Sequence, residues 1–371
     1  MEQNINDILR KNITFAYNEA LEFVVSLGMI ACEGQLLAVA EDYKLEMDPL
    51  ALAYHEEART RLSPHSYREL QFFFGYNFFH KALDFAFYES VCSTAEPLTV
   101  ETWLARLEES SADRTVSEMV YGVYHDHMDG LLQGRDWEVV KYDIPLLTEL
   151  VRKTEPQQEV AAAHGPLLEC LNYPEECKLR YMQFLRQFYK DVFSHWSEAL
   201  KKQSQQGAAY YKQLFLDNPE RFIREINTND PTLYDIPTTF HISFMSQVGN
   251  YFLHLYKETG ELGWVVFGIH NEEAFGPPAA REKVELFLKA FSDKRRLDLL
   301  LLLKKRPHYG QEIAAALGIT PAAVNYHSNF LFFLGLIELK REEHRLYYHL
   351  HTDKLEELLA LTSKVMLDEG Y

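Results

Sequence analysis

The stretch GITPAAVNYHSNFLFFLGLIELKREEHR, residues 318–345, contains the local signals that decide the fold of the C-terminal part of the chain. Gly318 is typical of a helix end, because glycine adopts the left-handed conformation without strain. Thr320 offers an N-cap hydroxyl to the next helix, and Pro321 fits the first helical position, where its missing N–H costs nothing. The apolar spacing that follows predicts a helix that ends at Gly335.

The segments around this helix predict four helices followed by a hairpin. Residues 279–292, 293–306 and 307–318 each have the apolar spacing of an amphipathic helix. Two alternating runs, 336–340 and 345–351, predict strands joined by a short turn. Helix, turn, helix and hairpin in this order are typical of a winged helix-turn-helix.

At these residues the sequence resembles the ArsR-type winged-helix transcriptional regulators of bacteria and archaea. Four segments and four single positions carry the resemblance, namely FSDKRRLDLLLLL, QEIAAALGIT, AAVNYHSNFLFFLGLI and RLYYHL, with His327, Leu331, Gly335 and Leu336 at the family's spacing. The family often has Ser where this chain has Asn325, and Leu where it has Ser328. The resemblance implies DNA binding as a homodimer through helices near 281–291 and 353–366. The first 270 residues resemble, by layout only, a subgroup with a long helical front.

The predicted recognition helix carries no positive charge, because residues 307–339 contain neither Lys nor Arg. Base edges are read by hydrogen bonds and methyl contacts, whereas cations at the flanks can bind the phosphates that supply most of the affinity. We expect base-reading or groove-facing residues at Thr320, Ala322, Ala323, Asn325, Tyr326 and Asn329. We expect phosphate-binding residues at Lys304, Lys305, Arg306, Lys340, Arg341 and Arg345. The alternative interpretation of the groove-facing set is an ordinary solvated face. Helical spacing places the remaining face inward, with Val324, His327, Ser328 and Leu331, and a packed histidine is favoured over a base contact for His327.

The charge of the chain changes sign along its length. The net charge of the whole chain is −18, yet residues 281–345 contain 12 Lys and Arg against 8 Asp and Glu, a net of +4. Residues 1–280 carry a net charge of −19. An acidic front repels DNA, so we expect it to project away from the duplex, unless it folds over the basic flanks and masks them.

In front of the winged helix, the spacing to about residue 222 is mostly helical. Alternating apolar runs then predict two or three antiparallel strands, at 239–245, 250–256 and 262–269. The predicted fold class is therefore mainly α, with a large helical N-terminal domain, a small antiparallel β element and a C-terminal winged helix-turn-helix. The expected domains are 1–237 for the helical sensor or effector domain, 238–270 for the β element, 271–283 for a Gly- and Pro-containing linker, and 284–371 for the DNA-binding and dimerisation domain.

Several function classes receive little support from the sequence. We find no P-loop, dinucleotide-binding or nucleophile-elbow motif, no secretory signal and no membrane-spanning run, so we expect a cytoplasmic protein that is not an enzyme. The four cysteines form no CxxC pair, and residues 281–371 contain none, which excludes a thiolate metal site there. We expect no metal and no cofactor. The alternative function is a small-molecule-binding or metal-dependent enzymatic domain fused to a DNA-tethering module, suggested by His125, His127 and Asp129 at H-x-H-x-D spacing.

Overall fold

The structure, a computed structural model, describes residues 5–34, 36–37, 46–76, 90–92, 97–157, 160–227, 229–257, 260–272, 280–342 and 345–367. The chain forms two compact units, and each contains segments that are distant in sequence. Unit 1 comprises residues 1–15, 209–240 and 248–371, and unit 2 comprises residues 16–208 and 241–247.

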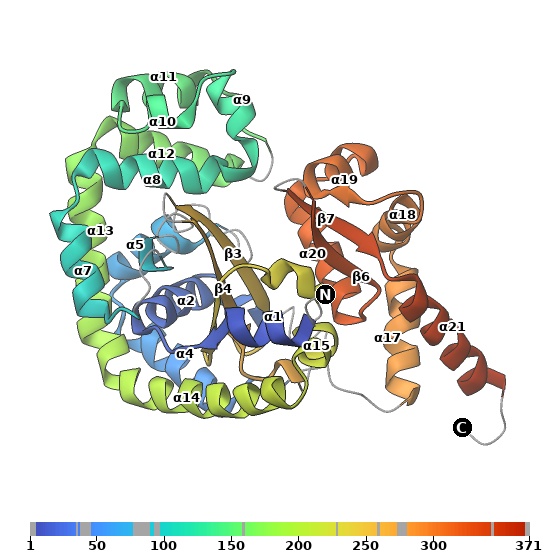
Figure 1. The fold of residues 1–371 in the computed structure, drawn as a ribbon. Coiled ribbons are helices and arrows are strands. Elements are labelled where there is room, and N and C mark those ends of the chain that lie inside the picture. The colour runs from blue at the N-terminus through green and yellow to red at the C-terminus, as the bar shows by residue number, and fades with distance from the viewer. Residues whose placement is uncertain are drawn as a thin grey trace. The chain divides into compact units, whose positions relative to one another are not determined.

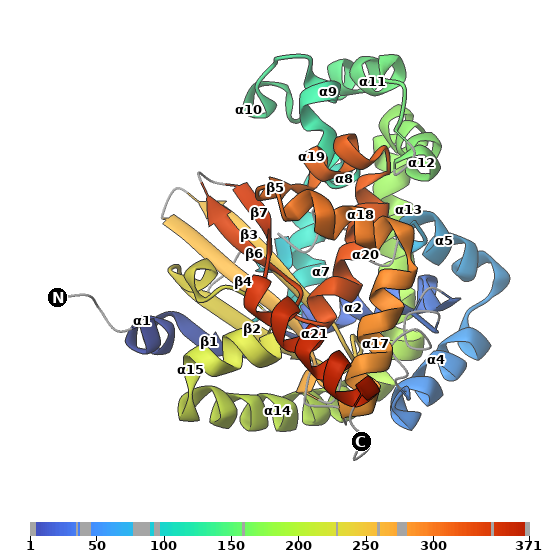
Figure 2. The same cartoon turned by 90° about the vertical axis from the view of Figure 1, so that its right-hand side faces the viewer.

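Unit 1 contains the predicted winged helix-turn-helix. Its helices and strands are α17 Ala280–Ser292, α18 Lys294–Leu303, β5 His308–Tyr309, α19 Gly310–Leu317, α20 Pro321–Phe333, β6 Ile337–Glu342, β7 Arg345–Leu350 and α21 Thr352–Leu367. The strands form a three-stranded sheet in the order β5-β7-β6, in which both neighbouring pairs are antiparallel. Figure 2 shows α17 and α21, which pack against each other, beside this sheet.

Unit 1 also contains a second, four-stranded sheet. Its elements are α1 Ile5–Asn12, β1 Ile13–Phe15, α15 Pro219–Arg221, η3 Phe222–Asn227, η4 Pro231–Tyr234, β2 Thr238–Ser243, β3 Asn250–Lys257 and β4 Gly260–Gly268. The strand order is β1-β2-β4-β3. The β3–β4 pair is antiparallel, as predicted, whereas β1 pairs parallel to β2. Alternation did not reveal β1, because three residues are too few for a period of two to stand out.

Unit 2 consists mainly of helices. They are α2 Glu19–Ala31, α4 Pro49–Arg61, α5 Pro64–Phe74, α7 Val100–Glu109, α8 Ala112–Tyr124, η1 His125–His127, α9 Met128–Leu132, α10 Trp137–Val140, α11 Ile144–Lys153, α12 Ala161–Asn172, α13 Pro174–Phe188, η2 Tyr189–Phe193 and the beginning of α14 Ser194–Asp217. Helix α13 packs against α7 and α8, which lie beside it in Figure 1. Local caps begin most of these helices: the side chains of Thr99 and Ser111, for example, accept a backbone hydrogen bond at the first turns of α7 and α8.

The centre of unit 2 is helix α2, which is buried on all sides. A helix that is apolar all round needs neighbours on every face. The ring of Phe23 accordingly packs against Trp103, Phe188 and Phe193, with centroid distances of 6.1, 5.9 and 5.0 Å. The abundance of aromatic residues noted in the sequence therefore serves helix packing here.

Helix α2 also buries a carboxylate, Glu22, which is 0% exposed. Its Oε2 lies 2.8 Å from Nε2 of the equally buried His241, and its Oε1 accepts a 2.8 Å hydrogen bond from the backbone N–H of Met245. Nδ1 of His241 accepts from the N–H of Asn18 at 3.2 Å, so Nε2 is the nitrogen that carries the proton toward Glu22. These bonds satisfy a group whose burial would otherwise cost several kcal/mol, roughly. They attach residues 241–247 to unit 2.

The predicted fold class is confirmed: the molecule is mainly α, with a small antiparallel element and a C-terminal helix-turn-helix. The domain boundaries at residues 237, 270 and 283 stay a prediction, since the compact units follow pairings between distant segments rather than changes in composition. Residues 273–279 of the expected linker lie outside the described residues, as does most of the aromatic stretch after Tyr76. Within the described ranges, no helix combines the length and the apolar character needed to cross a membrane.

Candidate nucleic-acid interface

The recognition helix α20 begins as its sequence predicts. Gly318 adopts φ +59°, in the left-handed region, and so ends α19. Thr320 is extended, and its Oγ1 accepts a 2.9 Å hydrogen bond from the N–H of Ala323. Pro321 follows at the first helical position. Because the cap involves only neighbouring residues, the start of the helix is determined locally.

The end of α20 is also locally determined. Gly335 has φ +66°, its N–H donates to the carbonyl of Phe332 at 2.8 Å, and the N–H of Leu336 donates to the carbonyl of Leu331 at 2.9 Å. This pair of bonds is a Schellman motif. Leu331 and Leu336 are both fully buried, which supplies the apolar contact that usually accompanies the motif. The chain leaves the helix directly into strand β6.

The two faces of α20 differ in burial. Val324, Ser328 and Leu331 are buried, as the spacing predicts. His327 is largely buried, and its Nδ1 lies 3.6 Å from Oδ2 of Asp293, which is too long for a hydrogen bond. Burial lowers the pKa of His327, and the Asp293 charge opposes this only in part. His327 is therefore a packed histidine, although Nδ1 has no hydrogen bond, contrary to our expectation for a packed imidazole.

On the opposite face, Tyr326 is 43% exposed. The other expected groove residues are partly exposed: Thr320, Ala322, Ala323, Asn325 and Asn329. Small or polar side chains and one exposed aromatic ring thus form the accessible side of the helix. Their role as base readers stays a prediction, since exposure alone does not distinguish a reading face from a solvated one.

The amide of Asn325 is tied to the wing by a contact that the sequence did not indicate. The hydroxyl of Tyr348, on β7, donates to Oδ1 of Asn325 at 3.1 Å. The ring of Tyr348 also packs against Phe332, with a centroid distance of 5.6 Å. An amide that reads adenine must hold its oxygen and nitrogen in a defined plane, so a bond that orients it bears directly on readout. The alternation of RLYYHL placed Tyr348 on a strand without showing which side chain it meets.

The predicted phosphate-binding residues differ in their surroundings. Lys304 and Lys305 are exposed, and the guanidinium carbon of Arg345 lies 5.0 Å from the ring centroid of Tyr309. Arg306 forms two bonds of 3.2 Å to the carboxylate of Glu312. Arg341 lies in β6, and its side chain lies outside the described part of the structure. A cation already paired with a carboxylate brings less positive charge to a polyanion.

Lys340 is the most compensated of the predicted phosphate-binding residues. Its Nζ lies 2.7 Å from Oε1 of Glu338 on the same strand and 3.7 Å from Oδ2 of Asp230, which precedes η4 in unit 1. Burial opposes its charge, but the hydrogen bond to Glu338 and the charges of Glu338 and Asp230 raise the pKa of Lys340 above its usual range. The wing therefore presents less net positive charge than its sequence suggests.

One basic residue of the domain has a structural role. Arg296 on α18 is only 5% exposed, and its guanidinium carbon lies 3.8 Å from the ring centroid of Phe330 on α20. Its backbone N–H donates to Oδ1 of Asp293, the N-cap of α18. The stacked pair joins α18 to α20 by a cation–π contact. Arg296 thus belongs to the core rather than to the DNA-facing surface.

Residues 293–338 match the family model described as "Bacterial regulatory protein, arsR family". The match runs from the cap of α18 to the beginning of β6 and so contains both helices of the helix-turn-helix. Residues 293–338 are an ArsR-family helix-turn-helix domain. Comparison with curated proteins and with solved structures gives no match for the chain. The ArsR-family domain indicates DNA binding and transcription regulation as the broad function.

The H-x-H-x-D segment of unit 2 does not form a metal site with its neighbours. His125 and His127 lie in the short helix η1, and Asp129 lies in α9. Among the described residues, no three or more His, Cys, Asp or Glu side chains are grouped so that they could hold a metal ion. The geometry thus offers no specific observation in favour of the enzymatic alternative.

Proposed function

We propose that this protein is a transcriptional regulator that reads operator DNA as a homodimer, with α20 in the major groove and the wing beside the adjacent phosphates. The observation that carries the proposal is the ArsR-family match over α18–α20, because these helices are the reading unit itself. The neutral accessible face of α20 suits hydrogen-bond and methyl readout. We assign no catalytic step to either unit.

The dimer interface that we propose lies on α17 and α21. These helices pack against each other and still leave apolar side chains accessible, namely Leu288, Leu359, Met366 and Leu367. A second copy can bury this surface, and two reading helices are what a palindromic operator of two half-sites requires. In this proposal unit 2 senses a small molecule or a partner protein. Its size and its own aromatic core are the support for an independent role.

The experiment that tests the proposal begins with isolation of genomic fragments bound by the full chain. Binding to the selected duplex and to a scrambled duplex is then measured by fluorescence anisotropy at fixed salt. Tyr326→Ala and Asn325→Ala should each cost about 1–3 kcal/mol, or about 5- to 150-fold, on the selected duplex and little on the scrambled one. The matched control is Tyr173→Ala, which removes a tyrosine that is 62% exposed in unit 2.

Light scattering of the full chain measures its oligomeric state in the same buffer. A mass of two chains, together with one dimer bound per palindromic duplex, is the expected result. The base-reading assignment is wrong if both α20 variants lose affinity equally for the two duplexes. A strictly monomeric protein that binds a single palindrome tightly contradicts the dimer.

A further inference from the structure

Three sulfur atoms from three helices of unit 2 meet in its core. The thiol of Cys177 on α13 lies 3.9 Å from the thioether sulfur of Met119 on α8, and it is hydrogen-bonded to the thiol of Cys170 on α12. Both cysteines are free thiols. Met119, Cys170 and Cys177 are all almost fully buried, with exposed fractions of 0, 1 and 3%.

The separation of these sulfur atoms fits a single coordinated ion. A metal–sulfur bond is about 2.3 Å long, taking the zinc–thiolate bond as the scale, and three sulfur ligands in a plane around one ion then lie about 4.0 Å from each other. The distance of 3.9 Å between the sulfur atoms of Met119 and Cys177 agrees with this value. A linear pair of ligands would need about 4.6 Å on the same scale.

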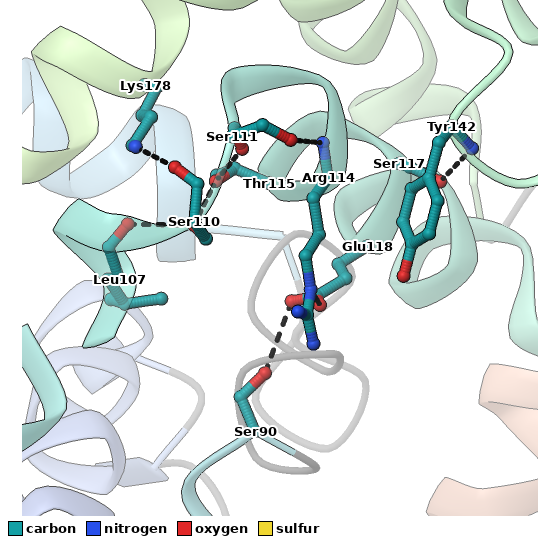
Figure 3. A network of polar contacts seen from close by, with 10 residues as sticks. All are labelled: Ser90, Leu107, Ser110, Ser111, Arg114, Thr115, Ser117, Glu118, Tyr142 and Lys178. Atoms are coloured by element: carbon teal, nitrogen blue, oxygen red, sulfur yellow. Dashed lines mark hydrogen bonds and ion pairs between the residues drawn. The ribbon is translucent and has the colours of Figure 1, made fainter.

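The helices that carry these sulfur atoms are held in place by a polar network (Figure 3). Lys178, the residue after Cys177, donates hydrogen bonds to the carbonyls of Glu108, at 2.8 Å, and of Ser110, where α7 leads into α8. Ser111 caps α8 by accepting from the N–H of Arg114 at 3.1 Å. Bonds of this kind fix α13 against the start of α8, so the sulfur atoms lie on a rigid framework rather than on a loop.

The same helix is tied down next to Met119. Glu118 accepts a 3.0 Å bond from Arg114 and a 3.2 Å bond from the hydroxyl of Ser90, and Ser117 accepts from the N–H of Tyr142 at 3.3 Å. All of these contacts lie within unit 2. A ligand set that is already ordered loses little conformational freedom when an ion binds.

We propose that Met119, Cys170 and Cys177 form a binding site for a soft monovalent metal ion of the copper(I) type. Thiolate and thioether sulfur select soft ions, whereas a site for a hard divalent cation consists of oxygen ligands. Two thiols and one thioether bind one monovalent ion by forming three metal–sulfur bonds and releasing the two thiol protons to solvent, with no oxidation or reduction.

The surroundings of Cys170 are consistent with this exchange of protons for a metal. The hydrogen bond with Cys177 and burial raise the pKa of Cys170 far above its usual range, while the nearby Arg180 charge opposes the shift. Both thiols therefore remain protonated until an ion replaces the protons, since coordination deprotonates a thiol. The Arg180 guanidinium also offsets part of the negative charge that two thiolates and one monovalent ion leave in the core.

The sequence predicted no metal site, because Met119 lies 51 positions before Cys170 and the two cysteines are separated by six residues that end one helix and begin another. The site is independent of DNA binding, so its test needs no operator. Full-length protein, reduced and kept free of oxygen, is titrated with copper(I) in competition with the chromogenic chelator bicinchoninate. The expected result is one copper(I) ion per chain that the chelator does not remove.

Three variants and one control locate the ion. Cys170→Ser and Cys177→Ser should each lose the chelator-resistant ion, and Met119→Leu should bind it more weakly because one uncharged ligand is missing. Cys32→Ser is the matched control, since Cys32 is another buried free cysteine, whose thiol donates to the carbonyl of Phe74. Circular dichroism of each variant checks that it is folded.

X-ray absorption at the copper edge gives a second readout on the unaltered protein and does not depend on the folding of any variant. Three sulfur neighbours at about 2.3 Å are expected, and two in Met119→Leu. Nitrogen or oxygen neighbours in place of sulfur, no ion retained against the chelator, or an undiminished ion in Cys170→Ser each overturn the proposal. Loss of the ion in Cys32→Ser to the same extent also overturns it.

Discussion

The bond between Tyr348 and Asn325 can be removed without disturbing the packing around it. Tyr348→Phe deletes the hydroxyl that donates to Oδ1 of Asn325 at 3.1 Å and keeps the ring that packs against Phe332. The backbone pairing of Tyr348 with Leu339 and His308 is independent of the hydroxyl. The variant therefore isolates one contribution, the orientation of the Asn325 amide by the wing.

The magnitude follows from the nature of the bond. It joins two uncharged side chains that are partly buried, and such a bond contributes about 0.5–1.5 kcal/mol net. If Asn325 reads a base, losing its orientation should weaken binding to the selected operator by about 2- to 12-fold. Binding to a scrambled duplex depends on phosphates, so it should change little.

The assay is fluorescence anisotropy with both duplexes at one salt concentration. The control is Tyr347→Phe, which removes a hydroxyl one residue away, on the opposite face of the strand. The Tyr347 ring packs against Tyr309, with a centroid distance of 5.8 Å, and this contact also survives the change. The control should retain full discrimination between the two duplexes.

A double-mutant cycle completes the test. In an Asn325→Ala background, Tyr348→Phe should have almost no further effect on operator binding, because the group that it orients is gone. Additive effects of the two substitutions would refute the reasoning, as would an equal loss for the selected and scrambled duplexes.

Three further predictions concern the wing, a helix end and the buried carboxylate. Asp230→Asn keeps the capping oxygen but removes a charge 3.7 Å from Lys340, so binding to scrambled DNA at low salt should tighten by up to about fivefold, and unchanged binding would show that Asp230 does not compete with phosphate. Gly335→Ala should lower the free energy of unfolding by about 1–2 kcal/mol in a urea titration through its φ of +66° alone, because the added carbon would meet Lys354 at an ordinary 3.5 Å; a much larger loss would point to a steric clash instead. His241→Ala should cost about 3–5 kcal/mol of unfolding free energy, since it leaves the Glu22 carboxylate without its partner, whereas His65→Ala at an exposed position should cost little; equal effects would contradict the proposed pairing.

The sequence by itself determined the elements of the winged helix-turn-helix. Thr320, Pro321 and Gly335 set the ends of α20 through bonds that span five residues or fewer, and such bonds form in the same way wherever the segment lies. The inward face of α20 could be predicted for the same reason, because helical spacing places Val324 and Leu331 on one side.

Only the tertiary structure decided which distant groups meet. Strand β1 lies beside β2 across 225 positions, Glu22 finds His241 across 219, and the Tyr348 hydroxyl reaches Asn325 across 23. Charge counting predicted a basic wing, yet Lys340 meets Asp230, which lies 110 positions earlier in the chain. Contacts of this kind depend on how whole elements pack, and a local pattern of residues has no information about which partner will lie opposite. The end of a helix is decided by its immediate neighbours, whereas the electrostatic and chemical character of a site is decided by side chains from separate segments of the chain.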